Sequence, residues 1–347
     1  MPRSPLIGTT NAGRFKVREL LGTGAMAEVY AAEHTDLERR YAIKFLRENI
    51  AADVVLVERF RREARAISRL EHPGIVSVVD FGRSERDQLY LVMEFVDGPS
   101  LQDAIEEAQP ARLPLRRSFD ILSQMARAAG AAHDSGVVHR DLKPENILLA
   151  RDPRGGDQVK ILDFGLAKIM EGAEFTSLTS RGEIFGTPDY MPPEQARGEP
   201  VSPQSDIYSI GVVAYELCAG RPPFVEKSMP NLLIAHQDQV PEPPSSLLPS
   251  GEPLPDSVEQ IILQCLRKDP ARRPARAEDV AAVFAEQLDI RSSKPRINVP
   301  PVKVGGDRRM TSQSDWHEVT LDPDTNVYTD PDSLRKLSGE LPAVSED

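Results

Sequence analysis

Residues 137–149 read VVHRDLKPENILL, and they are followed shortly afterwards by VKILDFGLAK at residues 159–168. These two stretches decide how the rest of the chain is interpreted. An earlier stretch, LGTGAMAEVYAAE at residues 21–33, is ambiguous by itself. Its Gly22 and Gly24 fit the G-x-G-x-x-G/A fingerprint of a dinucleotide-binding helix, but they equally suit a strand hairpin over a triphosphate. The answer must therefore come from the later stretches.

Taken together, these motifs resemble those of the protein kinase family in its bacterial serine/threonine form. The resemblance covers about residues 14–288, and the motifs occur in the order found in the family. It implies an α+β bilobal protein kinase fold, with a small antiparallel-sheet lobe and a larger helical lobe. It also implies an ATP-dependent enzyme of signal transduction that transfers the γ-phosphoryl group to Ser/Thr hydroxyls of proteins. Residues 28–34 are then predicted to be a strand, despite their helix-forming composition.

The pattern of apolar residues agrees with two lobes. Short apolar or alternating runs predict strands, and longer runs with apolar residues at helical spacing predict helices. The predicted strands are residues 15–21, 28–34, 39–46, 75–82 and 89–96. The predicted helices are residues 55–72, 100–108, 116–136, 206–220, 257–269 and 277–288. We therefore expect an N-terminal extension at 1–13, a kinase domain at 14–290 divided into lobes at 14–97 and 98–290, and a tail at 291–347.

The resemblance assigns the phosphoryl-transfer chemistry to residues of the second lobe. Asp141 matches the catalytic base that accepts the proton of the substrate hydroxyl. Lys143 matches the lysine that serine/threonine kinases place beside the γ-phosphate, which favours Ser and Thr over Tyr as acceptors. Asn146 and Asp163 match the two Mg²⁺ ligands, and hard oxygen donors suit a metal that also binds phosphate. Mn²⁺ is an alternative ion.

The small lobe is expected to hold the nucleotide. Lys44 matches the strand lysine that contacts the α and β phosphates, and Glu63 matches its carboxylate partner. The backbone at Gly22 and Gly24 would approach the phosphates closely, where a Cβ would clash. Met93 matches the residue at the back of the adenine pocket, followed by the hinge, residues 94–96. The expected nucleotide-binding residues are Leu21, Gly22, Thr23, Gly24, Val29, Ala42, Lys44, Met93, Glu94, Val96 and Leu148.

Other matched positions are expected to be structural. Four of them form the stack of side chains that links the lobes: Ile67, Val78, His139 and Phe164. Asp206 matches the buried aspartate at the base of this stack, and Glu194 and Arg273 match a buried ion pair.

Composition limits the other functions. The net charge of −12 argues against nucleic acid as a partner. No apolar run approaches the length of a membrane helix, and the N-terminus lacks the apolar core of a signal peptide, so a cytoplasmic protein is expected. Cys218 and Cys265 lie within apolar helical patterns, which predicts buried free thiols.

Regulation is expected in the activation loop, residues 165–187. Arg140 before Asp141 accompanies control by phosphorylation of this loop in the family. We expect autophosphorylation there, at Thr179 or Thr176 before the neighbouring Ser177 and Ser180. A homodimer would allow one copy to phosphorylate the other. Thr187 is instead expected to bond Asp141.

Two departures from the family pattern leave an alternative open. Ala27 replaces the third glycine, and Pro192 replaces the alanine of the APE triplet, which could shift the substrate-docking loop. A pseudokinase that binds nucleotide without transferring phosphate is therefore an alternative to an active kinase. A kinase of small molecules is a third hypothesis, which GTPDYMPPEQ at residues 186–195 disfavours because it resembles a peptide-docking segment.

The tail is polarised in charge. Residues 291–309 carry six basic and one acidic residue, and residues 310–347 carry two basic and nine acidic residues. Such a segment without apolar periodicity is predicted to be disordered. The segment around Trp316 is a candidate for docking a partner.

Overall fold

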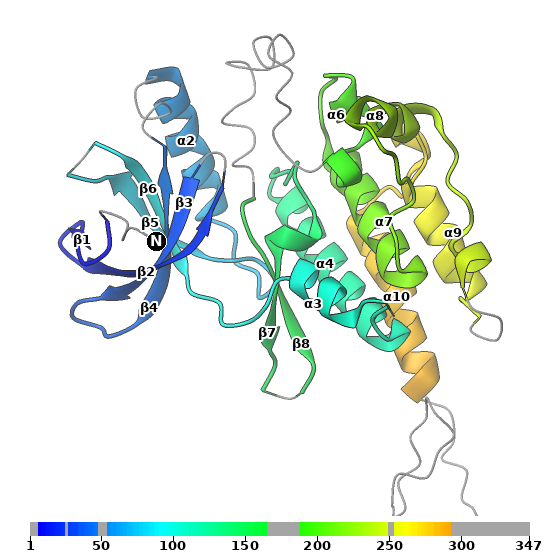
Figure 1. Ribbon diagram of the computed structural model, residues 1–347, viewed down its shortest axis with the longest axis horizontal. Coiled ribbons are helices and arrows are strands. Elements are labelled where there is room, and N and C mark those ends of the chain that lie inside the picture. The colour runs from blue at the N-terminus through cyan, green and yellow to red at the C-terminus, as the bar shows by residue number, and fades with distance from the viewer. Residues whose placement is uncertain are drawn as a thin grey trace, which may run out of the picture. The chain divides into compact units, whose positions relative to one another are not determined.

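The computed structural model describes residues 6–24, 27–47, 54–85, 87–110, 112–153, 155–164, 188–248 and 253–292. Figure 1 shows an antiparallel sheet formed by the N-terminal part of the chain, followed by a mainly helical part. The predicted α+β fold with a sheet lobe and a helical lobe is therefore confirmed.

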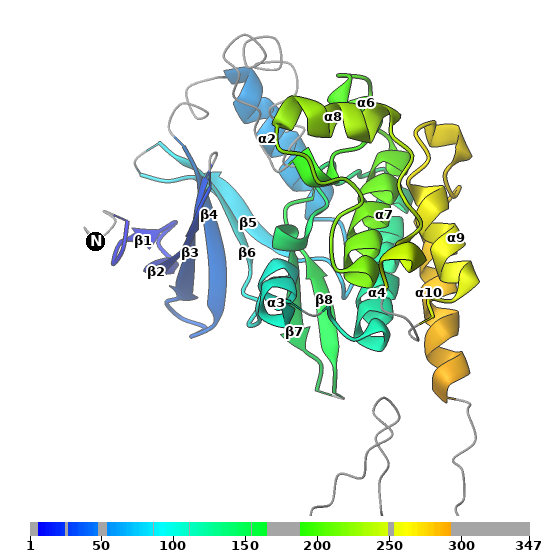
Figure 2. The same cartoon turned by 45° about the vertical axis from the view of Figure 1, so that its right-hand side comes forward.

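The sheet lobe contains six strands and one helix. The strands are β1 (Thr10–Asn11), β2 (Phe15–Thr23), β3 (Ala27–His34), β4 (Arg40–Leu46), β5 (Val78–Arg83) and β6 (Leu89–Glu94). They form one antiparallel sheet in the order β1-β2-β3-β4-β6-β5. Helix α2 (Val54–Ile67) packs on this sheet, where the Phe60 ring meets the Phe81 ring edge to face at 6.4 Å between centroids. Figure 2 shows α2 from a second direction, above and to the right of β5 and β6.

Strand β6 is buried on both faces. Side chains of a strand alternate between the two faces of its sheet. Leu91 and Met93 belong to the main core together with α2, whereas Tyr90 and Val92 belong to a second apolar cluster on the opposite face. The segment that follows β6 therefore starts from a strand that is fixed on both sides.

The glycine stretch forms the turn of a strand hairpin. Strands β2 and β3 are antiparallel, and Gly22 lies opposite Val29 in their register. The Gly24 N–H donates to the carbonyl oxygen of Ala27 across the turn at 2.8 Å. Residues 28–34 are thus a strand, as predicted, and not the helix of a dinucleotide site.

Residues 6–13 are packed onto the sheet. Strand β1 pairs with β2, and the Val17 N–H donates to the Thr9 carbonyl oxygen at 2.9 Å. Leu6 is buried in the same apolar cluster as Phe15 and Val17. Sequence patterns did not predict this strand, because two residues are too few to show alternation.

The second lobe is built around helices. Its longer helices are α3 (Leu101–Ala108), α4 (Leu115–Asp134), α7 (Pro203–Ala219), α8 (Met229–Asp238), α9 (Asp256–Cys265) and α10 (Ala277–Ser292). The shorter ones are η1 (Pro144–Asn146), η3 (Pro188–Tyr190), α6 (Pro193–Ala196), η4 (Pro244–Leu247) and η5 (Pro270–Arg272). Helices α4 and α10 pack together, with the Phe119 and Phe284 ring centroids 5.8 Å apart.

Helix α7 is the core of this lobe, because nearly all of its side chains are buried. Cys218 on α7 and Cys265 on α9 are buried free thiols, as predicted. Burial raises the pKa of each thiol to about 12. Within the described residues, no helix is long and apolar enough to cross a membrane.

A two-stranded hairpin, β7 (Ile147–Arg151) with β8 (Asp157–Ile161), connects the two motifs that decide the fold. Its turn contains Gly155 and Gly156, both with positive φ, a backbone conformation that glycine adopts readily. Strand β7 begins directly after the HRDLKPEN motif, and β8 ends two residues before Asp163. The hairpin therefore fixes the distance between these motifs.

Candidate active site

The HRD segment is held by a buried carboxylate. Asp206, in the first turn of α7, accepts the backbone N–H groups of His139 and Arg140, each at 2.8 Å. His133, near the end of α4, places its Nε2 2.8 Å from the same carboxylate. These bonds hold Arg140 with φ +73°, a backbone conformation that non-glycine residues rarely adopt. Asp206 therefore has the anchoring place expected for it.

Asp141 lies within a bonded group of polar side chains. Its Oδ2 is 2.9 Å from Lys143 Nζ. Asn146 Nδ2 donates to the Asp141 backbone carbonyl at 2.7 Å and to Oδ2 at 3.1 Å. The Asp141 side chain is 42% exposed, whereas the Lys143 side chain is 14% exposed. The structure thus presents a carboxylate to solvent with a cation and an amide fixed beside it.

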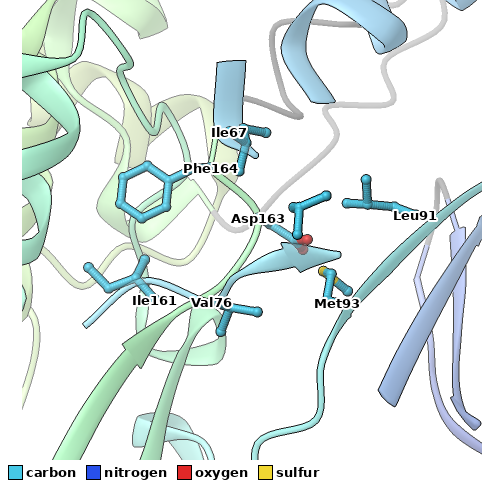
Figure 3. A pocket seen from close by; sticks show the side chains of 8 residues that line it. Ile67, Val76, Leu91, Met93, Ile161, Asp163 and Phe164 are labelled. Atoms are coloured by element: carbon cyan, nitrogen blue, oxygen red, sulfur yellow. The ribbon is translucent and has the colours of Figure 1, made fainter. Parts of the chain in front are cut away.

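Asp163 faces the small lobe. It has φ +61°, and its Oδ2 lies 2.6 Å from Nζ of Lys44, which projects from β4. Figure 3 shows the Asp163 carboxylate among the side chains between the lobes. A lysine from the sheet and an aspartate from the DFG motif therefore meet although they are far apart in the sequence.

In the described part of the chain, the Lys44 ammonium contacts a carboxylate other than that of Glu63, the partner expected from the sequence. The Lys44 ammonium pairs with Asp163, and Glu63 Oε1 lies 3.5 Å from Arg62 on the same helix. The Glu63 side chain is 8% exposed. Its place on the buried side of α2 agrees with the sequence, and the Lys44 ammonium is bonded to Asp163.

The predicted stack between the lobes is assembled. The His139 and Phe164 rings are in edge-to-face contact at 4.7 Å between centroids. Ile67, Val78 and Phe164 line one small cavity together with Met93 (Figure 3). His139 Nδ1 accepts the Asp141 N–H at 3.2 Å, so Nε2, 2.6 Å from the Leu162 carbonyl oxygen, carries the proton.

The hinge begins where β6 ends. Met93 is buried and lies opposite Ala42 of β4, and Glu94 lies opposite Tyr41. Leu148 lies on β7 in the second lobe, with Ser100 forming an isolated bridge to it. The structure thus places expected nucleotide-binding residues on the sheet, the hinge and the β7–β8 hairpin.

The glycine turn has a further property. Within the described residues, a Cβ added to Gly22 would meet no atom within 4 Å, and neither glycine of the pair has a positive φ. Leu21, next to them, is 47% exposed. The described part of the chain therefore does not itself require glycine at position 22.

The ion pair between Glu194 and Arg273 is present and fully buried. Arg273 NH1 and NH2 donate to the two carboxylate oxygens at 2.7 and 2.8 Å. Burial acts to raise the pKa of Glu194, but hydrogen bonds from Arg273 and Ser205 outweigh it and leave that pKa below the ordinary value. Glu194 stands two residues after Pro192, the N-cap of α6, so it holds the segment that contains the altered APE triplet.

Some contacts of the site were not predicted from sequence. Tyr190 donates its hydroxyl to Glu216 on α7 at 2.7 Å, and Lys160 on β8 pairs with Glu94 at 2.6 Å. The contact of His133 with Asp206 was also not predicted. The sequence around a histidine near a helix end does not show whether its side chain is buried and hydrogen-bonded or exposed. Only its spacing ahead of the HRD segment could have indicated it.

Several expectations fall outside the described residues. They concern the activation loop with Thr176, Ser177, Thr179 and Ser180, the nearby Thr187, and the tail around Trp316.

This arrangement is that of a protein kinase domain. A model of the protein kinase domain family matches residues 15–285, and the chain belongs to this family. The chain is 38% identical over 343 residues to serine/threonine-protein kinase pkn3 of Myxococcus xanthus, covering 96% of this chain and 62% of the relative. It is 39% identical over 289 residues to serine/threonine-protein kinase pkn2 of the same organism, covering 83% of this chain and 34% of the relative.

A mycobacterial relative and a solved structure agree with these matches. Serine/threonine-protein kinase PknA of Mycobacterium tuberculosis strain H37Rv is 41% identical over 303 residues, covering 86% of this chain and 67% of the relative. The crystal structure of the M. tuberculosis PknI kinase domain superimposes with a TM-score of 0.64 at 28% identity, covering 82% of this chain and 100% of that domain. The chain spans 34% of the length of pkn2 and 62% of that of pkn3.

Proposed function

We propose that the protein is an ATP-dependent serine/threonine protein kinase that phosphorylates proteins in signal transduction. The observation that carries the proposal is the bonded group of Asp141, Lys143 and Asn146 beside the pair of Asp163 with Lys44. Phosphoryl transfer requires a base, cations and oxygen donors for a metal. Asp141 would be the base, and Lys143 and Lys44 the cations. Asn146 and Asp163 would supply the oxygen donors. The names of the relatives as serine/threonine-protein kinases support the substrate class.

In the proposed reaction, the exposed Asp141 carboxylate accepts the proton of a Ser or Thr hydroxyl and directs its oxygen at the γ-phosphorus. The new bond joins that oxygen to phosphorus, and the bond from phosphorus to the bridging oxygen of ADP breaks. Lys143, held 2.9 Å from Asp141, is placed to neutralise charge on the transferring group. Lys44 would bind the α and β phosphates, exchanging its contact with Asp163 for one with the nucleotide.

Asn146 and Asp163 are the proposed Mg²⁺ ligands, with Mn²⁺ as a substitute. Asn146 uses its amide nitrogen to bond Asp141, which orients the amide and leaves the carbonyl oxygen as its remaining donor. Carboxylate and amide oxygens suit a hard divalent cation. When bound, such an ion would neutralise charge on the phosphate oxygens.

The proposed ATP site uses the glycine turn, the sheet, the hinge and β7. The open space at Gly22 supports this assignment, because a bound phosphate would explain a glycine that the chain itself does not need. The proposed residues are Leu21, Gly22, Thr23, Gly24, Val29, Ala42, Lys44, Met93, Glu94, Val96 and Leu148. Glu63 is proposed to become the partner of Lys44 when nucleotide replaces that lysine's contact with Asp163.

The finer parts of the proposal concern regulation and context. We propose autophosphorylation at Thr179 or Thr176 by a second copy in a homodimer, with the phosphate paired to Arg140. The kinase domain is proposed to occupy residues 14–290 and the tail around Trp316 to dock a partner. Cytoplasmic location and the absence of a nucleic-acid partner belong to the same proposal.

The test is transfer of labelled phosphate from Mg·ATP to the protein itself and to a generic basic protein substrate. Asp141→Asn should abolish incorporation while ADP binding remains. Asp134→Asn is the matched control, because it makes the same chemical change at an exposed aspartate that pairs with Arg276 on the surface. Label on Ser and Thr alone supports the substrate class. Equal incorporation by wild type and Asp141→Asn, or label on Tyr alone, would refute the proposal, and mapping of the labelled residues tests the activation loop.

A further inference from the structure

The hinge is tied to the second lobe by a pair of charged side chains. Lys160, on β8, places its Nζ 2.6 Å from Oε1 of Glu94, the last residue of β6. The Lys160 side chain is 13% exposed and that of Glu94 is 31% exposed. An ion pair with one partner largely shielded from water is screened less than a surface pair. The contact therefore joins the two lobes at the start of the hinge.

The same glutamate is also bonded to the segment before β5. The Ser77 N–H donates to Glu94 Oε1 at 3.0 Å, and the Glu94 N–H donates to the Ser77 carbonyl oxygen at 3.0 Å. A single carboxylate oxygen thus receives bonds from two separate segments. Both the backbone and the side chain of Glu94 are held, so the peptide group that follows it has little freedom to rotate.

Lys160 is itself held in place. It lies opposite Leu148 in the β7–β8 ladder, and the next residue, Ile161, exchanges backbone bonds with Gly74 and Val76 at 2.9 and 3.0 Å. His72 faces Lys160, and burial, with a smaller contribution from the Lys160 charge, lowers the pKa of that histidine. The lysine is therefore a fixed cation, and the chain runs from it through Ile161, the last residue of β8, to Asp163, three residues after the lysine.

We infer that Lys160 is a positioning residue for nucleotide binding. Through Glu94, it holds the hinge in the conformation that binds the base and couples it to the strand that leads to Asp163. A hinge ordered before binding loses less conformational entropy when nucleotide binds. The inference rests on the proposed ATP site, since it assigns a role to a residue outside that set.

A merely structural pair would behave differently. Loss of such a pair lowers the folded fraction, and thereby the apparent kcat, without changing the affinity of the molecules that remain folded. Loss of a positioning pair weakens nucleotide binding and raises KM for ATP, whereas kcat per folded molecule does not fall. Comparing the change in KM for ATP with the change in kcat per folded molecule therefore separates a positioning role from a merely structural one.

The experiment uses the full chain and measures ADP Kd by calorimetry, KM for ATP and kcat by phosphate transfer, and the folded fraction by thermal melting. Lys160→Met should raise both ADP Kd and KM for ATP about fivefold, as expected for a partly shielded ion pair. Lys160→Arg should stay within about twofold of wild type, because its guanidinium also pairs with a carboxylate. Glu94→Gln keeps the shape of the side chain and should resemble Lys160→Met.

Arg117→Met is the matched control. The Nε of Arg117 lies 2.7 Å from Oδ2 of Asp157. Asp157 is on β8, as Lys160 is, but it lies at the end of β8 that is far from Asp163. This variant should keep ADP Kd within about twofold of wild type. The inference is overturned if Lys160→Met and Glu94→Gln leave ADP Kd unchanged, or if Arg117→Met raises it equally. A wild-type chain that binds ADP but transfers no phosphate refutes the proposed function alone, and one that binds no ADP refutes both.

Discussion

Asp206 of α7 accepts backbone bonds from His139 and Arg140 at equal distances of 2.8 Å. The Asp206 side chain is 1% exposed, and the helix that carries it is the most deeply buried of the second lobe. Asp206 thus holds the two residues that directly precede the exposed Asp141, and Asp206 is itself buried. The backbone geometry at Asp141 is therefore set by a residue of the core. The site depends on the core of the lobe as much as on its surface.

Replacement of this anchor should cost both stability and activity. Asp206→Ala leaves two buried N–H groups without their acceptor, and we expect a loss of about 3 kcal/mol in the free energy of unfolding. Phosphate transfer per folded molecule should also fall, because the backbone strain at Arg140 is no longer supported. Denaturant melts and kinetics measure the two effects. Normal transfer by the folded fraction would contradict this role.

Two glycines should respond in opposite ways to the same substitution. A Cβ at Gly98 would lie 2.1 Å from the Leu149 carbonyl oxygen, a backbone atom, so Gly98→Ala should destabilise the fold by about 3 kcal/mol. The Cβ of Gly22→Ala meets no atom of the described residues within 4 Å, so this variant should leave the melting temperature unchanged while raising KM for ATP. Each variant is thus the control for the other. Similar melting temperatures for the two variants would show that the close approach at Gly98 is relieved without cost.

His236 should make stability depend on pH. Burial, with a smaller contribution from the Lys268 charge, lowers the pKa of His236 from 6.5 to about 4. The unfolded chain therefore binds a proton as pH falls below 6.5, whereas the folded chain stays neutral until about pH 4. Stability should decline as pH falls through this window, by up to about 3 kcal/mol in total. His236→Phe should flatten the pH dependence of urea melts, and an unchanged slope would exclude this histidine as its source.

Replacing only one partner of the buried ion pair between Glu194 and Arg273 should destabilise the fold more than replacing both partners. Arg273→Met leaves the Glu194 carboxylate buried without its main partner, and we expect about 3 to 5 kcal/mol of destabilisation. Adding Glu194→Gln in the same chain should recover part of this loss. The pKa of Glu194 is lowered in the folded state, so its contribution is present at neutral pH and is lost as pH falls below the ordinary glutamate value of 4.5. A double-mutant cycle with zero coupling would contradict the pair.

Sequence patterns predicted most strands and long helices, because these elements show alternation or helical spacing over many residues. They missed β1, which has two residues, the hairpin strands β7 and β8, and α8 (Met229–Asp238), which has a proline in its first turn. The helix predicted at 257–269 ends at Cys265, because Pro270 disfavours helical backbone before it and itself opens η5.

The candidate site likewise contains features that local sequence patterns predict and contacts that they do not. The motifs identified Asp141, Lys143 and Asn146 as a local group, because their spacing within one loop brings them together. The partner of Lys44 depended instead on the placement of α2 against the DFG segment, which no local pattern contains. Contacts such as Lys160 with Glu94 join residues far apart in the chain, so only the folded topology reveals them.

Strand β1 has a consequence for association between molecules. By pairing with the beginning of β2, it occupies N–H and C=O groups near Phe15 and Val17 that would otherwise form an open sheet edge, and Leu6 covers the apolar side chains beneath. An open edge beside exposed apolar surface is a template for strand pairing with another chain. A chain that began at Arg14 would keep every residue of the proposed site, yet it should aggregate at concentrations where the longer chain stays dispersed.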